Sequence, residues 1–556
     1  MNSSDDNIKI KKAGLYERVI LIALFILGIV YFAPRFFLPG IPEYGHDSLF
    51  HVFRLMGLDN AFISPVTYNF VDTGSMLNVF YPWLTMYPMW IVYHLTGNFV
   101  IAYNSYFCLI TLAGLYISYF SAKKITGDVI SSFCFSVLYI FSSYRFLNMF
   151  LRGSLGEIIV MSFLPLVLCG IYQILYGNYR GSYTLCIGMT LIAYSHILSL
   201  YLVSFVLLLI VLPSIFVISD KAGRIVNLIK NAFLAVGLSL GSLEPILYYS
   251  IKDSVYHPDG FRYLFENASC DLLMILKYSL LNYLSPFSYG PIIISAILIN
   301  LIFVILIKDI NKGLKNFLYV LVIMSFVLLI MISTLIPWGD LSEYSPIRII
   351  QFPYRFGMYL TLFVSFVFSV SLSFINKFKI KNLVSMAVVV FSILLFGLQN
   401  KEINGIEPLF MINDDTVKNV IVFDSIDYVS EEFYRYRESQ AFMPLDSFYD
   451  NERIRSSVVP GGNSIYFAVL NTAKGESIEL PVCMFNSTKI TVNGTDQVPV
   501  KTENGTVSFT SLSDGEADVL VYNVDAPAVY ISWIVSFICL IIFCLYVVRR
   551  KGKSAL

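Results

Sequence analysis

Long apolar runs separated by short polar segments recur along most of this chain. A helix that crosses a lipid bilayer needs about 17 to 25 mainly apolar residues, and about a dozen runs meet that requirement. We expect crossing helices at residues 18–36, 99–121, 129–143, 158–176, 183–197, 200–218, 232–249, 291–307, 318–336, 357–374, 383–398 and 529–548. The pattern therefore predicts an α-helical polytopic membrane protein.

Two longer stretches interrupt this series: a first loop at residues 37–98 and a polar region just before the last apolar run. In the polar region, apolar and polar residues alternate as in β-strands, and Asn-Gly pairs favour hairpin turns. The alternating segments are residues 465–470, 489–492, 506–510 and 517–522, and the Asn-Gly pairs are Asn493-Gly494 and Asn504-Gly505. We expect a membrane domain at 1–398, a β-sandwich-like domain at 399–527, and a final helix with a basic tail at 528–556.

Composition supports a membrane protein and excludes some partners. Hydrophobic residues make up 57% of the chain and charged residues only 14%, with a mean hydropathy of +0.70, whereas soluble proteins average about 25% charged residues. The 38 Lys and Arg residues balance 38 Asp and Glu residues. A chain without excess positive charge is not expected to bind nucleic acid, so the lipid bilayer is the partner that composition predicts.

The positions of the basic residues predict the orientation. Cytoplasmic loops of membrane proteins carry an excess of Lys and Arg. If the N-terminus is cytoplasmic, alternate crossings place the basic residues together inside, at Arg180 and near residues 11–12, 123–124, 221–230, 308–315, 377–381 and 549–553. This assignment requires that the apolar segment 83–94 does not cross. Both termini are then cytoplasmic, and the first loop and the β-rich domain are extracytoplasmic.

The first outer loop contains a candidate catalytic segment. Helical spacing puts Asp47, His51 and Arg54 on one narrow face, with Leu49 and Val52 opposite. This pattern predicts an amphipathic helix along the membrane surface, and a carboxylate beside cations can act as a general base. The alternative interpretation is an ordinary solvated polar face.

Further charged residues fall near the outer ends of predicted crossings. Arg145 and Arg152 share a predicted helical face, Glu157 follows as a potential partner, and Arg355 lies in a similar setting. Guanidinium groups at a bilayer edge either anchor the helix or bind anions such as phosphate. His196 stands at another outer helix end, where it could donate to a sugar or a phosphate or serve only a structural purpose.

The order of these features resembles the GT-C superfamily of polyprenyl-phosphate-sugar-dependent glycosyltransferases. The chain looks more closely like bacterial membrane proteins of the pyruvoyl-tetrahydropterin synthase-related type, and its outer β-domain and last helix are similar to those of YfhO-type proteins. The segments that carry the resemblance are residues 45–54, 144–157, 195–196 and 352–355.

The resemblance implies an inverting transferase in the cytoplasmic membrane of a bacterium. It would move a sugar from a polyprenyl-phosphate-linked donor to a cell-envelope glycan or polymer outside the membrane. Asp47 would be the general base, His51 and Arg54 would orient or neutralise, and Arg145, Arg152 and Arg355 would hold the phosphate. Unlike metal-dependent members, the chain has no paired acidic residue beside Asp47, which makes a divalent metal doubtful.

Two other classes of function fit the crossing pattern. A transporter or lipid flippase would also have many crossings, but secondary transporters place their sites near the bilayer midplane between repeated halves, and this sequence shows no evident repeat. A non-catalytic scaffold for envelope assembly would explain the outer domain but not the Asp47, His51 and Arg54 face.

Overall fold

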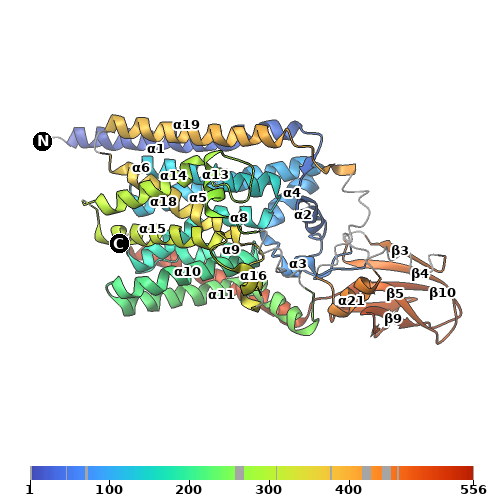
Figure 1. Ribbon diagram of the computed structural model, residues 1–556. Coiled ribbons are helices and arrows are strands. Elements are labelled where there is room, and N and C mark those ends of the chain that lie inside the picture. Colours follow the sequence, from blue (N-terminus) through green and yellow to red (C-terminus); the bar gives the residue numbers. More distant parts are fainter. Residues whose placement is uncertain are drawn as a thin grey trace.

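The computed structural model describes residues 3–45, 47–68, 73–256, 268–308, 310–342, 344–375, 378–415, 428–440, 452–459 and 462–554. Its helices run side by side in one bundle, and a β-rich region projects from one end (Figure 1). Both termini lie at the opposite end of the bundle. The predicted polytopic helical fold with a β-rich region before the last helix is confirmed.

Nine helices in the described part of the chain are long and apolar enough to cross a membrane. They are α1 (Ser3–Phe32), α5 (Phe99–Thr126), α8 (Leu155–Leu175), α10 (Ile197–Val217), α11 (Lys221–Lys252), α15 (Lys312–Ile332), α18 (Gly357–Ser373) with η4 (Pro353–Phe356), α19 (Phe378–Ile403) and α22 (Pro527–Ser554).

The other three predicted crossings are also helical but differ in shape. One is α6 (Val129–Ile140), which is followed after a 41° bend by α7 (Ser143–Phe146) and η3 (Leu147–Leu151). The remaining two are short apolar helices, α9 (Thr184–Ala193) and α14 (Pro291–Leu306). In agreement with the prediction for segment 83–94, α4 (Tyr87–Thr96) has only 10 residues, too few to cross a bilayer. Helix α9 also has 10 residues, so by length alone it does not make the crossing predicted at 183–197.

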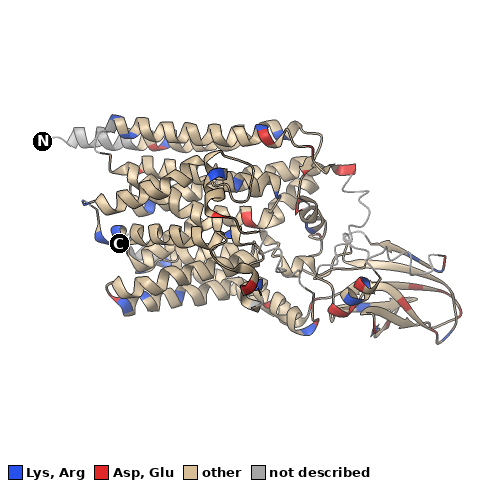
Figure 2. Cartoon of the chain, in the orientation of Figure 1, with Lys and Arg blue, Asp and Glu red and all other residues tan. Residues whose placement is uncertain are grey.

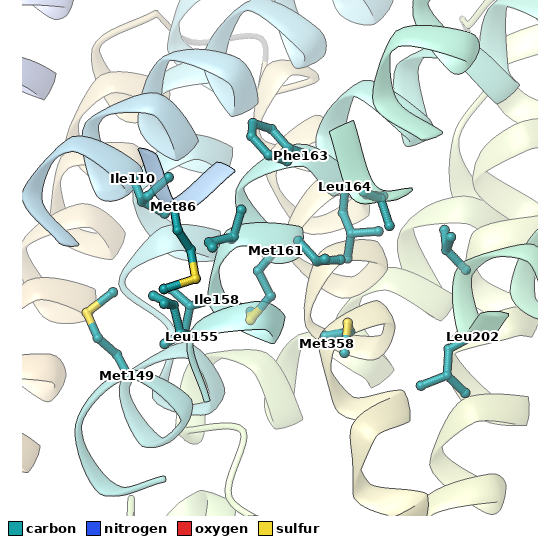
Figure 3. Close-up of a cluster of buried hydrophobic side chains, with 14 of the residues drawn as sticks. Met86, Ile110, Met149, Leu155, Ile158, Met161, Phe163, Leu164, Leu202 and Met358 are labelled. Carbon is teal, nitrogen blue, oxygen red and sulfur yellow. The ribbon is translucent and has the colours of Figure 1, made fainter. Parts of the chain in front are cut away.

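Helices α8 and α18 are the most enclosed crossings, because neighbouring helices cover nearly every side chain along their length. Apolar residues of α8 pack against side chains from the first loop and from α5, α10 and α18 (Figure 3). The residues labelled in that cluster are Met86, Ile110, Met149, Leu155, Ile158, Met161, Phe163, Leu164, Leu202 and Met358. This packing fixes the first turn of α8, which carries Glu157.

The β-rich region contains two antiparallel sheets. The larger has strand order β3-β4-β10-β6-β7 and the smaller β5-β9-β8. The strands are β3 (Ile454–Val458), β4 (Ser464–Thr472), β5 (Ser477–Cys483), β6 (Thr488–Val492), β7 (Thr495–Gln497), β8 (Val500–Lys501), β9 (Thr506–Thr510) and β10 (Gly515–Asn523). Asn493 and Gly494 have φ values of 50° and 74°, as a type I′ turn requires, and they join β6 to β7 as the sequence predicts.

The first outer loop connects the bundle to the β-rich region. Strand β1 (Ile41–Glu43) pairs with β2 (Phe410–Ile412), and α2 (Asp47–Met56) and α3 (Leu77–Phe80) lie between the bundle and the sheets (Figure 1). The Asn523 side chain donates to the Tyr68 hydroxyl at 2.8 Å. These contacts anchor the chain on both sides of α2.

Lys and Arg recur at the end of the bundle that carries the termini (Figure 2). Because positive charge accumulates on the cytoplasmic side of membrane proteins, this distribution favours cytoplasmic termini. The orientation across the membrane stays a prediction.

Candidate active site

A buried carboxylate that we did not predict from the sequence fixes the start of α2. Glu43 is 1% exposed, and its two oxygens accept hydrogen bonds from the backbone N–H groups of Gly45 and Leu49, each at 2.9 Å. A carboxylate there satisfies free N–H groups and interacts favourably with the helix dipole. The sequence feature that could have identified Glu43 is an acidic residue shortly before a predicted helix. Glu43 thereby positions Asp47, the first residue of α2.

The segment after η3 brings Arg152 to the beginning of α2. Gly153 has φ +65°, and a Cβ atom there would lie 2.2 Å from Ser48 Oγ and 2.9 Å from Ser48 N. Only glycine accepts both this backbone conformation and this close approach. The π-helical turn at Leu147–Leu151 directly precedes the segment, and such turns occur often at functional sites.

Two arginines share one carboxylate beside Asp47. Arg152 donates through Nη1 and Nη2 to the two oxygens of Glu157, each at 3.2 Å, and Arg355 Nε donates to Glu157 Oε1 at 2.8 Å. The exposed fractions of these side chains are 14%, 6% and 2% for Arg152, Arg355 and Glu157. With two positive charges against one negative charge, the cluster keeps one excess positive charge.

Aromatic rings and an amide hold the two guanidinium groups in place. The Arg152 and Arg355 guanidinium carbons lie 5.0 Å from the Tyr354 ring and 4.8 Å from the Phe352 ring, respectively. Arg355 Nη1 donates to Gln351 Oε1 at 2.8 Å, and Gln351 has a strained φ of 59°, a feature that clusters at functional sites. No described residue accepts a hydrogen bond from Arg152 Nε or Arg355 Nη2, which leaves donors for an anion.

Asp47 lies in the electrostatic field of this cluster. Burial raises the pKa of its carboxyl to about 6, although Arg152 and Arg355 oppose the increase and Glu157 and Glu43 add to it. No hydrogen-bonding partner of this carboxylate lies among the described residues. At neutral pH the group is mainly ionised and still basic enough to accept a proton, which suits a general base.

His51 is oriented by its neighbours and stays neutral. The Leu155 backbone N–H, at the start of α8, donates to His51 Nε2 at 3.2 Å, and Nδ1 lies 3.1 Å from Arg54 Nη1. Burial, Arg54 and His196 hold the pKa of His51 well below its usual value. The imidazole therefore joins α2 to α8.

Arg54 is 1% exposed and holds the loop after α3. Its Nη2 donates to the backbone carbonyls of Tyr81 and Pro82 at 3.1 and 2.8 Å, and its guanidinium lies 5.0 Å from the Tyr81 ring centroid. The prediction that Asp47, His51 and Arg54 form an outward polar face on a surface helix is wrong for the last two, because this loop and α8 cover their side of α2.

His196 completes the group from the start of α10. Its Nδ1 lies 2.8 Å from Ser199 Oγ, and its ring centroid lies 5.5 Å from that of Tyr81. A Cβ atom on Gly156 would lie 2.8 Å from the imidazole, so His196 packs on the first turn of α8 beside Glu157.

Arg145 does not join the other predicted phosphate ligands. It is fully buried, and it donates to the Ile158 carbonyl at 3.0 Å and to Ser162 Oγ at 3.1 Å, both on α8. The π-helical turn between Arg145 and Arg152 breaks the regular helical spacing on which the shared face was predicted. The structure thus brings together Asp47, His51, Arg54, Arg152, Glu157, His196 and Arg355, with Arg145 apart.

An apolar cavity lies between α9, α10 and α11, within the crossing region. Its lining includes Leu185, Met189, Ala193, Leu207 and Val236. Residue Ala193 ends α9, three positions before His196. One lining residue of the cavity is therefore close in sequence to His196 of the polar site.

The described residues hold no group of three or more His, Cys, Asp or Glu side chains arranged to bind a metal ion. No protein-family model matches the sequence, and a search of curated proteins finds no match.

The solved structures that are similar to the chain include two that each share 12% sequence identity with it. The first is arabinofuranosyltransferase AftD from mycobacteria, with a TM-score of 0.42 over 67% of this chain and 27% of AftD. The second is ArnT from Cupriavidus metallidurans bound to undecaprenyl phosphate, with a TM-score of 0.27 over 65% of this chain and 77% of ArnT. The chain thus matches about a quarter of the length of AftD.

Proposed function

We propose that this protein is a membrane glycosyltransferase that transfers a sugar from a polyprenyl-phosphate-linked donor to an extracytoplasmic cell-envelope acceptor. The observation that carries the proposal is the placement of the Asp47 carboxyl, with its raised pKa, beside the excess positive charge of Arg152, Arg355 and Glu157. A base and an anion-binding group are the two functions that transfer from a sugar phosphate requires.

In the proposed reaction, an acceptor hydroxyl attacks the anomeric carbon of the donor sugar from the face opposite the phosphate. The new carbon–oxygen bond forms as the bond to the phosphate oxygen breaks, so the configuration inverts. The hydroxyl proton passes to Asp47, and the negative charge of the departing polyprenyl phosphate is stabilised by Arg152 and Arg355. Donors held in place before the reaction stabilise such developing charge effectively.

Glu157 gives the two arginines a fixed geometry in this mechanism. Without it, two buried guanidinium groups would repel each other, and burial of an unpaired charge is costly. Because Glu157 neutralises only one of the two charges, the pair can still attract a phosphate. We therefore assign Glu157 a positioning role, with His51 and Arg54 orienting α2.

The apolar cavity between α9, α10 and α11 supports a lipid-linked donor. An isoprenoid chain needs an apolar surface within the membrane, and this cavity provides one next to the segment that carries His196.

A transporter is less well supported, because Asp47, Arg152 and Glu157 gather at the end of α8 and not along its middle.

The experiment compares cells that lack the gene with cells that express wild-type protein or Asp47→Asn. Surface glycans and lipid-linked sugars are analysed by mass spectrometry. We expect loss of one glycan modification and accumulation of its lipid-linked donor in the deletion strain and with Asp47→Asn, since loss of a general base costs about 10²- to 10⁴-fold. Asp59→Asn, another first-loop carboxylate, should behave as wild type. Normal glycans with well-expressed Asp47→Asn would refute the mechanism.

A further inference from the structure

The hydroxyl group of Tyr354 lies among the charged residues of the candidate active site. Tyr354 belongs to η4 and directly precedes Arg355. Its hydroxyl interacts electrostatically with the two arginines of the site, with Glu157 and with Asp47. It is therefore close both to the proposed proton acceptor and to the guanidinium groups proposed to receive the phosphate.

Three side chains hold the Tyr354 ring in place. The Phe352 ring stacks on it at a centroid distance of 5.2 Å and an interplanar angle of 7°, and the Phe287 ring meets it edge-on at 6.0 Å. The Arg152 guanidinium carbon lies 5.0 Å from the centroid of the Tyr354 ring. These contacts restrict the ring, so its hydroxyl has a defined position before any substrate binds.

The hydroxyl itself has no protein partner. No described residue exchanges a hydrogen bond with it, although the Tyr354 side chain is only 9% exposed. The hydroxyls of Tyr144 and Tyr289 also lack partners, but other atoms enclose them completely, whereas that of Tyr354 keeps access to free space. A nearly buried donor without a partner costs free energy, which a ligand in the site would recover.

The donors of the site match a phosphate group that leaves a sugar. Arg152 Nε and Arg355 Nη2 have no acceptor among the described residues, and the Tyr354 hydroxyl adds a third donor. A phosphate bound to a sugar and a lipid is a diester with two terminal oxygens. Once it leaves the sugar it is a monoester with three terminal oxygens and more negative charge. The third donor corresponds to the oxygen that the reaction releases.

We propose that the Tyr354 hydroxyl donates a hydrogen bond to the phosphate oxygen that separates from the sugar. The inference rests on the proposed function, because it adds a catalytic residue to that reaction. As the bond between this oxygen and the anomeric carbon breaks, its electron pair stays on the oxygen. The acceptor proton passes to Asp47, and Tyr354 keeps its own proton. A fixed donor at an oxygen that gains charge during the reaction lowers the barrier.

Binding of two probes to the full-length protein in lipid nanodiscs tests the contact by titration calorimetry. Farnesyl phosphate, a short polyprenyl phosphate, has three terminal oxygens, and its methyl ester, like the sugar donor, has two. Tyr354→Phe keeps the ring and its contact with Arg152 but removes the hydroxyl. It should weaken binding of farnesyl phosphate roughly tenfold or more, the loss expected for a hydrogen bond to a charged group. Binding of the methyl ester should change by no more than about twofold.

Tyr289→Phe is the matched control. It also removes a tyrosine hydroxyl without a partner, but one that other atoms enclose completely, and it should leave the affinity for both probes unchanged. Size-exclusion profiles establish folding. Retained binding of the methyl ester by Tyr354→Phe shows in addition that the rest of the site is intact.

Three results would overturn the inference: wild-type protein that does not bind farnesyl phosphate, Tyr354→Phe protein with wild-type affinity, or an equal loss of affinity for both probes. These results are distinct from a failure of the proposed function. If the probes bind as expected while Asp47→Asn leaves surface glycans normal, the transfer mechanism fails and the phosphate contact of Tyr354 stands. If Tyr354→Phe binds both probes like wild type while Asp47→Asn abolishes the glycan modification, the transferase stands without this contact.

Discussion

Arg355 and Glu157, which are 198 positions apart in the sequence, form an ion pair of 2.8 Å inside the protein. The pair joins the start of α18 to the start of α8, the two most enclosed helices of the bundle. It therefore links the packing of the membrane domain to the position of the charge that faces Asp47.

Loss of Glu157 should destabilise the fold as well as the site. Glu157→Ala removes the carboxylate with which both Arg152 and Arg355 pair, and removing one partner of a buried ion pair typically costs about 3–5 kcal/mol. The free energy of unfolding, measured in detergent, should fall by that amount. Glu431→Ala, which breaks the exposed pair with Arg435, should cost no more than about 0.5 kcal/mol. Equal effects of the two variants would mean that the buried pair is not a stabilising element.

Gly153→Ala tests whether the contact between Arg152 and α2 depends on close packing. The added methyl group would meet Ser48 within 2.2 Å at a φ of +65°, which should displace α2 and reduce transfer at least tenfold. Gly97→Ala has a similar φ of +62° but nothing within 4 Å of the added atom. It should show only the backbone strain of about 1–2 kcal/mol and keep its activity.

The helices were predictable from the sequence because the bilayer imposes long apolar runs, and the alternating strands because one face of each sheet is buried. Helix lengths were less predictable. Crossing 183–197 was expected to be one helix, but α9 ends at Ala193, and the backbone of His196 is extended, with φ −161° and ψ 111°. Gly188 lies inside α9, and no Gly or Pro follows Ala193 in that segment, so the sequence alone did not indicate the end.

The charged residues of the site were predictable in part, because ionisable groups are expensive at a membrane boundary and stand out there. The contacts of Arg54 with the Tyr81 and Pro82 carbonyls could not be predicted, because every residue has a backbone carbonyl and the sequence does not show which one will accept a hydrogen bond. The prediction that Arg145 lies beside Arg152 was wrong for a related reason, because its partners on α8 are a backbone carbonyl and a serine.

The predicted orientation can be tested by cysteine labelling. In a protein whose Cys270, Cys539 and Cys544 are replaced by serine, cysteine is introduced at Lys474, in the β-rich region, or at Lys379, near the start of α19. Both positions are exposed. An impermeant maleimide should label the Lys474 position in intact cells and the Lys379 position only after permeabilisation. The reverse pattern would place the candidate site on the cytoplasmic side, although it would leave the fold unchanged.

The pH dependence of transfer should report the ionisation of Asp47. Because burial raises the pKa of this carboxyl to about 6, the proposed base is mainly protonated below that pH. The rate should fall about tenfold per pH unit below pH 6 and change little just above it. The negative charge of Glu43 contributes to the raised pKa, so Glu43→Gln, which keeps one hydrogen-bond acceptor, should move the acidic limb to lower pH. Initial rates with a purified lipid-linked donor would measure both profiles. An acidic limb near pH 4 in the wild type, or one that Glu43→Gln leaves in place, would assign the ionisation to a group other than Asp47.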